Sequence, residues 1–172
     1  MPRILPALLA ATALAAPAFA DGHVGARVTG DVRDRDGALV GSVSVMETAG
    51  GVVLAVVQVN GLSAGTHGVH LHETGACEGD FSSAGGHIAG DASHGLVEGG
   101  PHPGDLPNAY VQEDGVLAMD AFAAPGLSVS EHLMDEDGAA LIVHSGPDDY
   151  VSQPSGEAGD RVACAVLNQQ EM

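Results

Sequence analysis

Short apolar segments with alternating polar residues recur along the chain and are separated by glycine-rich turns. Segment 42–45, for example, reads Ser-Val-Ser-Val, an alternation that is typical of a β-strand with one buried face. About eight short strands without helical periodicity predict an all-β fold, either a sandwich or a barrel. The expected strands span residues 26–32, 42–45, 52–59, 68–72, 109–111, 116–123, 139–144 and 162–167.

The segment 66–105 holds six of the nine histidines and dominates the chemistry of the chain. His70 and His72 fall on the expected strand 68–72, where they share one face while Val69 and Leu71 point to the core. Such a pair on a rigid strand predicts a two-pronged metal site, since neutral imidazole suits zinc and copper. A His-x-His pair on a strand is also common without any metal, so this alternative stays open.

The rest of that segment is rich in glycine and proline and has no regular period, so it is predicted to be a loop. Three imidazoles of this loop and the carboxylate at its end are a plausible tetrahedral set for Zn(II). Loop histidines are more often solvated polar residues, and the number of imidazoles in one segment is what favours the metal site. The predicted zinc ligands are His87, His94, His102 and Asp105.

Charge and the N-terminal sequence limit the partners and the location. The chain has no lysine and a formal net charge of −18, which argues against binding to nucleic acid or to an anionic membrane surface. Residues 1–20 have the pattern of a signal peptide, with Arg3, an apolar run and a small-x-small cleavage site, which leaves one domain over 21–172. No later segment is expected to span a membrane. An exported chain with only two cysteines, Cys77 and Cys164, favours an oxidised pair over buried free thiols.

Four motifs in order along the chain carry a resemblance to a known family. They are His67-Gly68-Val69-His70-Leu71-His72, Ser83-Ala84-Gly85-Gly86-His87, Gly104-Asp105-Leu106-Pro107 and Gly159-Asp160-Arg161-Val162-Ala163-Cys164. With these motifs the chain after residue 20 resembles exported bacterial copper/zinc superoxide dismutases. The resemblance implies an eight-stranded antiparallel Greek-key barrel or sandwich with long metal-binding and electrostatic loops. It also implies a periplasmic or secreted enzyme, a monomer or homodimer, that converts superoxide to dioxygen and hydrogen peroxide.

The resemblance also implies a role for each site residue. His87 would bridge the two metals and supply a proton, Arg161 would guide superoxide, and Asp148 would join a copper ligand to a zinc ligand. Cys77 and Cys164 would form a disulfide, His67 would be structural and His132 has no assigned role. Copper would be held by His70, His72, His87 and His144, and zinc by His87, His94, His102 and Asp105.

The sequence leaves two alternative functions to consider, and it also contains one possible metal site near its N-terminus. A non-catalytic copper- and zinc-binding protein of the same fold would lack a copper ligand or Arg161, and neither is missing. A structural β-domain with incidental histidines would not explain their spacing. Cleavage after Ala20 would leave Asp21-Gly22-His23, whose amine, two amides and imidazole could form a square-planar site for Cu(II) or Ni(II). The alternative for this last segment is a frayed terminus with an incidental histidine.

Overall fold

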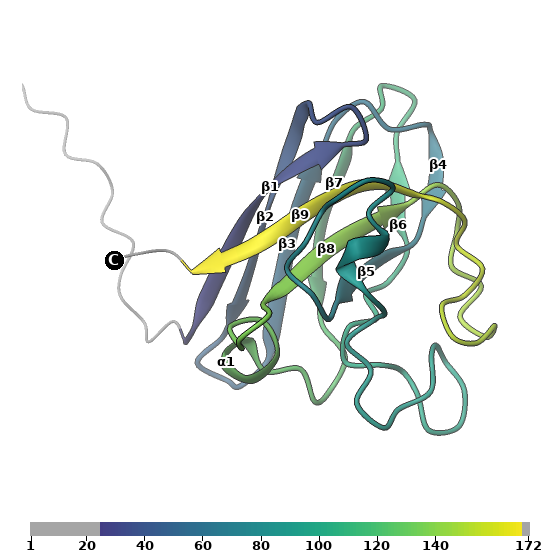
Figure 1. Cartoon of the computed structure of the whole chain (residues 1–172). Coiled ribbons are helices and arrows are strands. Elements are labelled where there is room, and N and C mark those ends of the chain that lie inside the picture. The colour runs from purple at the N-terminus through teal and green to yellow at the C-terminus, as the bar shows by residue number, and fades with distance from the viewer. Residues whose placement is uncertain (1–24, 170–172) are drawn as a thin grey trace, which may run out of the picture.

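The computed structural model describes residues 25–169, and nearly all of its regular structure is antiparallel β-sheet. Seven strands form one curved sheet in the order β5-β8-β9-β1-β2-β3-β7, and β4 pairs with β6 beside it (Figure 1). The strands are β1 (Arg27–Asp34), β2 (Leu39–Glu47), β3 (Val53–Val59), β4 (Gly65–His67), β5 (Val69–His72), β6 (Ala109–Val111), β7 (Leu117–Phe122), β8 (Ala139–His144) and β9 (Arg161–Gln169).

Two connections curl this sheet into a partly closed barrel. The strand expected over 68–72 is β5, which begins at Val69 and pairs with β8. β4 ends at His67, before Gly68, and pairs with β6; it was not predicted. A tight turn at 112–116 then joins β6 to β7, the last strand of the large sheet. Two short helical turns were not predicted, η1 (Ser82–Ala84) and α1 (Val129–His132). The all-β antiparallel barrel is therefore confirmed, with one short strand, β4, that was not predicted.

The core is made almost entirely of aliphatic side chains. Val28, Val45 and Val57, from β1, β2 and β3, are each at most 1% exposed and belong to one buried cluster. Their neighbours along each strand are polar or partly exposed, which is the alternation seen in the sequence. The burial of these apolar faces explains why the strands form a single sheet around one core.

β8 departs from that alternation because both of its faces are covered. Leu141 and Val143 face the main core, whereas Ala140 and Ile142 pack with Phe81 in a smaller cluster on the other face. A strand that is buried on both sides reads as a continuous apolar run, as residues 139–143 do. The second cluster lies beneath the loop that follows β5, so it also holds that loop against the sheet.

Two long loops lie beside β5, at one side of the barrel (Figure 1). The first runs from 73 to 108 and the second from 145 to 160. They contact each other, since Leu96 N–H donates to the Tyr150 carbonyl at 2.8 Å. No helix between residues 25 and 169 is long and apolar enough to cross a membrane. The predicted signal peptide at 1–20 and the predicted copper site at Asp21-Gly22-His23 lie outside the described residues.

Candidate metal centre

β5 presents His70 and His72 on the face opposite to Val69 and Leu71, as the alternation predicted. Both imidazoles are nevertheless buried, at 0% and 1% exposure, because the first loop covers them. The backbone of the loop pairs with the free side of β5: Ile88 N–H donates to the Leu71 carbonyl at 2.9 Å, and Leu71 N–H donates to Gly104 at 2.8 Å. This pairing brings two predicted loop ligands, His87 and Asp105, directly beside the strand.

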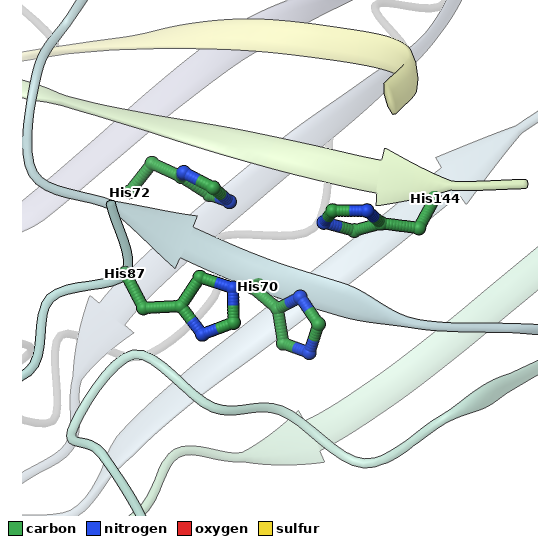
Figure 2. A group of neighbouring side chains, drawn as sticks. All are labelled: His70, His72, His87 and His144. Atoms are coloured by element: carbon green, nitrogen blue, oxygen red, sulfur yellow. The ribbon is translucent and has the colours of Figure 1, made fainter. Parts of the chain in front are cut away.

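Four imidazoles meet in a first group, formed by His70, His72, His87 and His144 (Figure 2). Their possible ligand atoms all lie within 4.8 Å of one another, and all four side chains are buried. One nitrogen of each ring has no hydrogen-bond partner: His70 Nδ1 and the Nε2 atoms of the other three. A buried nitrogen without a partner destabilises the folded state unless it binds a ligand, so this set of four donors fits a metal ion. A set of four imidazoles suits copper.

The other ring nitrogen of each strand histidine in this group has a partner that fixes its orientation. Gly85 O lies 3.0 Å from His72 Nδ1, and Gly159 O lies 3.2 Å from His144 Nδ1. A carbonyl can only accept, so both Nδ1 atoms carry the proton and both Nε2 lone pairs face the group. Hydrogen bonds of this kind commonly orient histidine ligands of metals.

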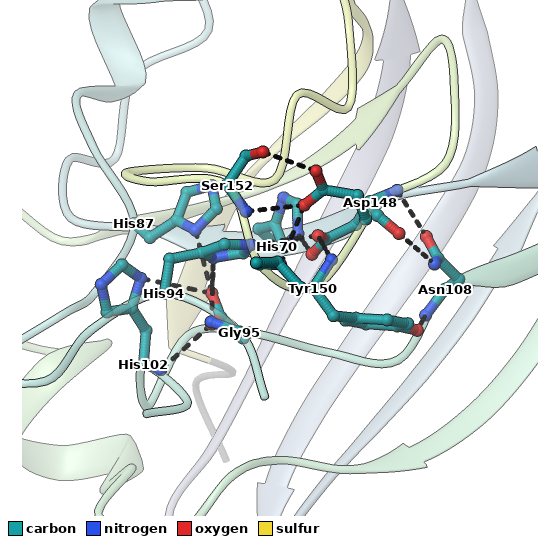
Figure 3. A network of polar contacts seen from close by, with 12 residues as sticks. His70, His87, His94, Gly95, His102, Asn108, Asp148, Tyr150 and Ser152 are labelled. Carbon is teal, nitrogen blue, oxygen red and sulfur yellow. Dashed lines mark hydrogen bonds and ion pairs between the residues drawn. The ribbon is translucent and has the colours of Figure 1, made fainter. Parts of the chain in front are cut away.

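A second group is formed by His87, His94, His102 and Asp105, whose possible ligand atoms also lie within 4.8 Å of one another. Asp105 Oδ1 is 2.9 Å from His87 Nδ1, 3.1 Å from His94 Nδ1 and 3.3 Å from His102 Nδ1 (Figure 3). Three imidazoles and a carboxylate fit tetrahedral zinc. His87 is a member of both groups and has one nitrogen toward each.

Burial and hydrogen bonding set the charge of these side chains before any metal binds. Burial lowers the pKa of His72 to about 2 and that of His144 to about 4, so both are neutral at pH 7. Burial alone would raise the pKa of Asp105, but hydrogen bonds from His87 and from Gly95 N–H lower it overall. The neutral His72 and His144 in the first group and the ionised Asp105 in the second are in the protonation states that metal binding requires.

Asp148 lies between the two groups (Figure 3). Its Oδ2 is 2.8 Å from His70 Nε2, and its Oδ1 is 3.0 Å from His94 Nε2 and accepts from Tyr150 N–H at 2.6 Å. Burial would raise the pKa of Asp148, but these hydrogen bonds lower it to about 2. Gly156 leaves room for the carboxylate, because a Cβ there would lie 1.9 Å from Asp148 Oδ1. One carboxylate thus links a histidine of the first group to a histidine of the second.

Sequence reasoning missed the residues that hold Asp148 and His94 in place. Asn108 is bonded twice to the Asp148 backbone, at 2.9 and 2.8 Å, and the Tyr150 hydroxyl accepts from Asn108 N–H at 2.6 Å. Gln153 likewise accepts from the backbone N–H of His94 and donates to its carbonyl. These contacts join residues about 40 to 60 positions apart, and no local pattern in the sequence signals them.

The guanidinium of Arg161 lies at the border of the first group. It donates from Nη1 to the Phe81 carbonyl at 2.6 Å and from Nη2 to the Gly85 carbonyl at 2.7 Å, and β-sheet pairing puts its backbone opposite His144. The predicted disulfide between Cys77 and Cys164 is present and ties this part of the first loop to β9. Arg161 is therefore anchored by the loop that carries His87.

Two histidines stay outside both groups. His67 is buried, and its ring nitrogens bond to the carbonyls of His144 and Ser63, which fits the structural role expected of it. His132 lies in α1 and bonds to the carbonyl of Ser128 in its own turn. Neither residue belongs to a group of possible metal ligands within residues 25–169.

Comparison with known proteins agrees with this geometry. The family model described as copper/zinc superoxide dismutase matches residues 39–167. Superoxide dismutase [Cu-Zn] of Caulobacter vibrioides is 39% identical over 81% of this chain and 84% of its own length. Superoxide dismutase [Cu-Zn] 1 of Aquifex aeolicus is 36% identical over 80% of this chain and 85% of its own.

Two solved structures are similar to this chain over most of its length. The Bacillus subtilis SOD-like protein has a TM-score of 0.76 and 34% identity, covering 84% of this chain and 99% of that one. Cu/Zn superoxide dismutase from Brucella abortus has a TM-score of 0.68 and 30% identity, covering 83% and 99%.

Proposed function

Because the chain belongs to the copper/zinc superoxide dismutase family, we propose that its two histidine groups are the copper and zinc sites of this enzyme. The reaction converts two superoxide anions and two protons to dioxygen and hydrogen peroxide. Copper would be held by His70, His72, His87 and His144, and zinc by His87, His94, His102 and Asp105. Four unpartnered nitrogens that converge in the first group are the observation that carries this assignment.

The two metals differ in what they supply. When bound, copper provides one-electron redox chemistry, and zinc provides a fixed structural centre. The chain keeps the ligands ready for them: His72 and His144 stay neutral, and their protonated Nδ1 atoms are held by backbone carbonyls. The metal-binding nitrogens therefore need no further deprotonation or rotation of the ring.

Two side chains would act on the substrate. Arg161 would attract the superoxide anion, since its guanidinium is half-buried beside the first group and is held by the carbonyls of Phe81 and Gly85. His87 would hold and release a proton at Nε2, the nitrogen that faces the first group. Its Nδ1 is meanwhile occupied on the side of Asp105, at 2.9 Å.

Metal analysis combined with a dismutation assay tests the residue assignment. His72→Ala and His144→Ala should each bind less than one copper per chain and lose nearly all activity, while they keep the β-sheet circular dichroism signal. His132→Ala is the matched control, because it removes an imidazole that lies outside both groups. Full activity of His72→Ala at full metal loading would contradict the assignment. A parent protein that binds both metals but is inactive would instead be a non-catalytic metal-binding protein.

We also propose that the enzyme is exported, to the periplasm or beyond. The signal-like pattern of residues 1–20 and the Cys77–Cys164 disulfide support this location, since such bonds persist in oxidising compartments. Mass determination of the protein from the periplasmic fraction would show cleavage after Ala20. Sedimentation of the metal-loaded protein decides between the monomer and the homodimer.

A further inference from the structure

The Gly85 carbonyl joins two parts of the proposed copper site. It accepts from His72 Nδ1 at 3.0 Å and from Arg161 Nη2 at 2.7 Å. The first contact fixes the tautomer and ring orientation of a copper ligand, and the second fixes the guanidinium that attracts the substrate. The orientation of the Gly85-Gly86 peptide therefore affects both the His72 imidazole and the Arg161 guanidinium.

Glu73, the residue directly after β5, holds this peptide. Its backbone N–H donates to the Gly86 carbonyl at 3.0 Å, and Gly86 N–H donates to Glu73 Oε1 at 3.1 Å. The carboxylate also packs against Gly85, where a Cβ would lie 2.8 Å from Glu73 Oε1. Gly86 N–H belongs to the same peptide unit as the Gly85 carbonyl, so the carboxylate grips that unit at one end while His72 and Arg161 bond to the other.

We propose that Glu73 is a positioning residue for the active site, acting through the Gly85-Gly86 peptide on His72 and Arg161. The proposal rests on the proposed roles of those two residues. Glu73 is itself exposed, and the hydrogen bond of its carboxylate goes to Gly86 N–H, so we expect its effect on His72 and Arg161 to pass through this peptide. Loss of an exposed side chain should leave the fold intact, which makes the effect measurable.

Three variants separate position from charge. Glu73→Gln and Glu73→Ala remove the same negative charge, but only glutamine keeps an oxygen that can accept from Gly86 N–H. Asp80→Asn removes a different exposed acid close to Arg161 and leaves the Gly85-Gly86 peptide untouched. A change that appears in all three variants is due to charge, and a change that appears in Glu73→Ala alone is due to position.

Hydrogen exchange of the metal-free protein is the first measurement. The Gly86 amide should exchange about three- to tenfold faster in Glu73→Ala, the range of one lost hydrogen bond, and at the parent rate in Glu73→Gln. This measurement needs no bound metal. A failure to load copper would therefore contradict the proposed function without deciding the role of Glu73.

The second measurement is made on the copper- and zinc-loaded protein, with azide as an anionic probe. Glu73→Ala should change the Cu(II) electron paramagnetic resonance spectrum through His72 and weaken azide binding through Arg161. Glu73→Gln should retain the parent spectrum and bind azide more tightly than Glu73→Ala does. Parent exchange and a parent spectrum in Glu73→Ala, or equal changes in Glu73→Gln and Glu73→Ala, would overturn the proposal.

Discussion

At the scale of single residues, hydrogen bonds decide what each imidazole can do. His70 and His72 are neighbours on the same face of β5, yet they offer different nitrogens to the first group: Nδ1 from His70 and Nε2 from His72. Asp148 occupies His70 Nε2, and the Gly85 carbonyl occupies His72 Nδ1. The sequence reveals the two histidines but not this difference, because the partners come from distant loops.

Asp148→Asn tests the link between the two groups. The amide offers only one acceptor where the carboxylate accepts from both His70 and His94, so at least one ring loses its partner. We expect metal affinity to fall about 10- to 100-fold, measured by competition with a chelator. Asp149→Asn is the control with the same change of charge, because Asp149 is exposed and its side chain bonds only to Val151 and Ser152. Equal losses in the two variants would contradict the role of Asp148.

The neutral histidines predict how the stability of the metal-free protein depends on pH. The folded-state pKa values of His72 and His144, about 2 and about 4, lie below the ordinary 6.5. Above pH 6.5 both states are neutral and stability is fully present. As pH falls below 6.5 the unfolded chain takes up protons that the folded chain does not, so stability is lost. The loss is at most about 1.4 kcal/mol per pH unit for each histidine, down to about pH 4 for His144.

Urea unfolding of chelator-treated protein at several pH values between 7.5 and 5 measures this loss. The stability of His144→Gln should depend less on pH than that of the parent, because this variant lacks one of the two titrating histidines, His72 and His144. A free energy of unfolding that stays constant over this range would show that the histidines are not held neutral in the folded state.

At the scale of elements, the strands were predictable and the loops were not. β5 follows from alternation alone, since Val69 and Leu71 enter the core and the histidines take the other face. Alternation did not show that the residues before Gly68 form a further strand, β4, which pairs with β6 rather than with β8. The two loops obey no period, so the positions of Asn108 and Gln153 depend on contacts that form only in the folded chain. The predicted ligands do lie together in the structure. They could be predicted because their residue types, rather than any local structure, indicate metal binding.

The disulfide is the covalent link between the first loop and β9. Cys77→Ala together with Cys164→Ala opens a loop of 87 residues, which should lower the free energy of unfolding by about 4 to 5 kcal/mol in the chain-entropy model. Urea unfolding of the zinc-loaded protein, compared with the parent under the same conditions, measures the change. A loss below about 1 kcal/mol would show that packing of Phe81 and Ile142 already fixes the loop.

At the scale of the whole molecule, the substrate and the enzyme carry charge of the same sign. The formal net charge is −18, and the four arginines of the described chain lie on or next to β1 and at the start of β9. Distant repulsion should slow the approach of superoxide, whereas Arg161 should attract it locally. Salt screens exposed charges over ~8 Å at physiological ionic strength, so it weakens the distant repulsion more than the local attraction.

The dismutation rate should therefore hold or rise as ionic strength increases from low to roughly physiological values. Pulse radiolysis, which generates superoxide directly, measures the rate constant at each salt concentration. Arg161→Glu should lower the rate at every ionic strength. A rate of the parent that falls steeply with salt would mean that local attraction dominates the approach.

The pairing of the first loop with β5 protects an edge of the sheet against aggregation. β5 is the last strand of the large sheet, and the loop backbone at Ile88 and Gly104 covers its outer side. An uncovered edge strand offers unpaired amides and carbonyls to any other chain, and so invites aggregation. The segment proposed to hold the metals thus also covers this edge. We therefore expect metal supply to affect solubility as well as activity, because a loop loosened by the lack of zinc would expose that edge to other chains.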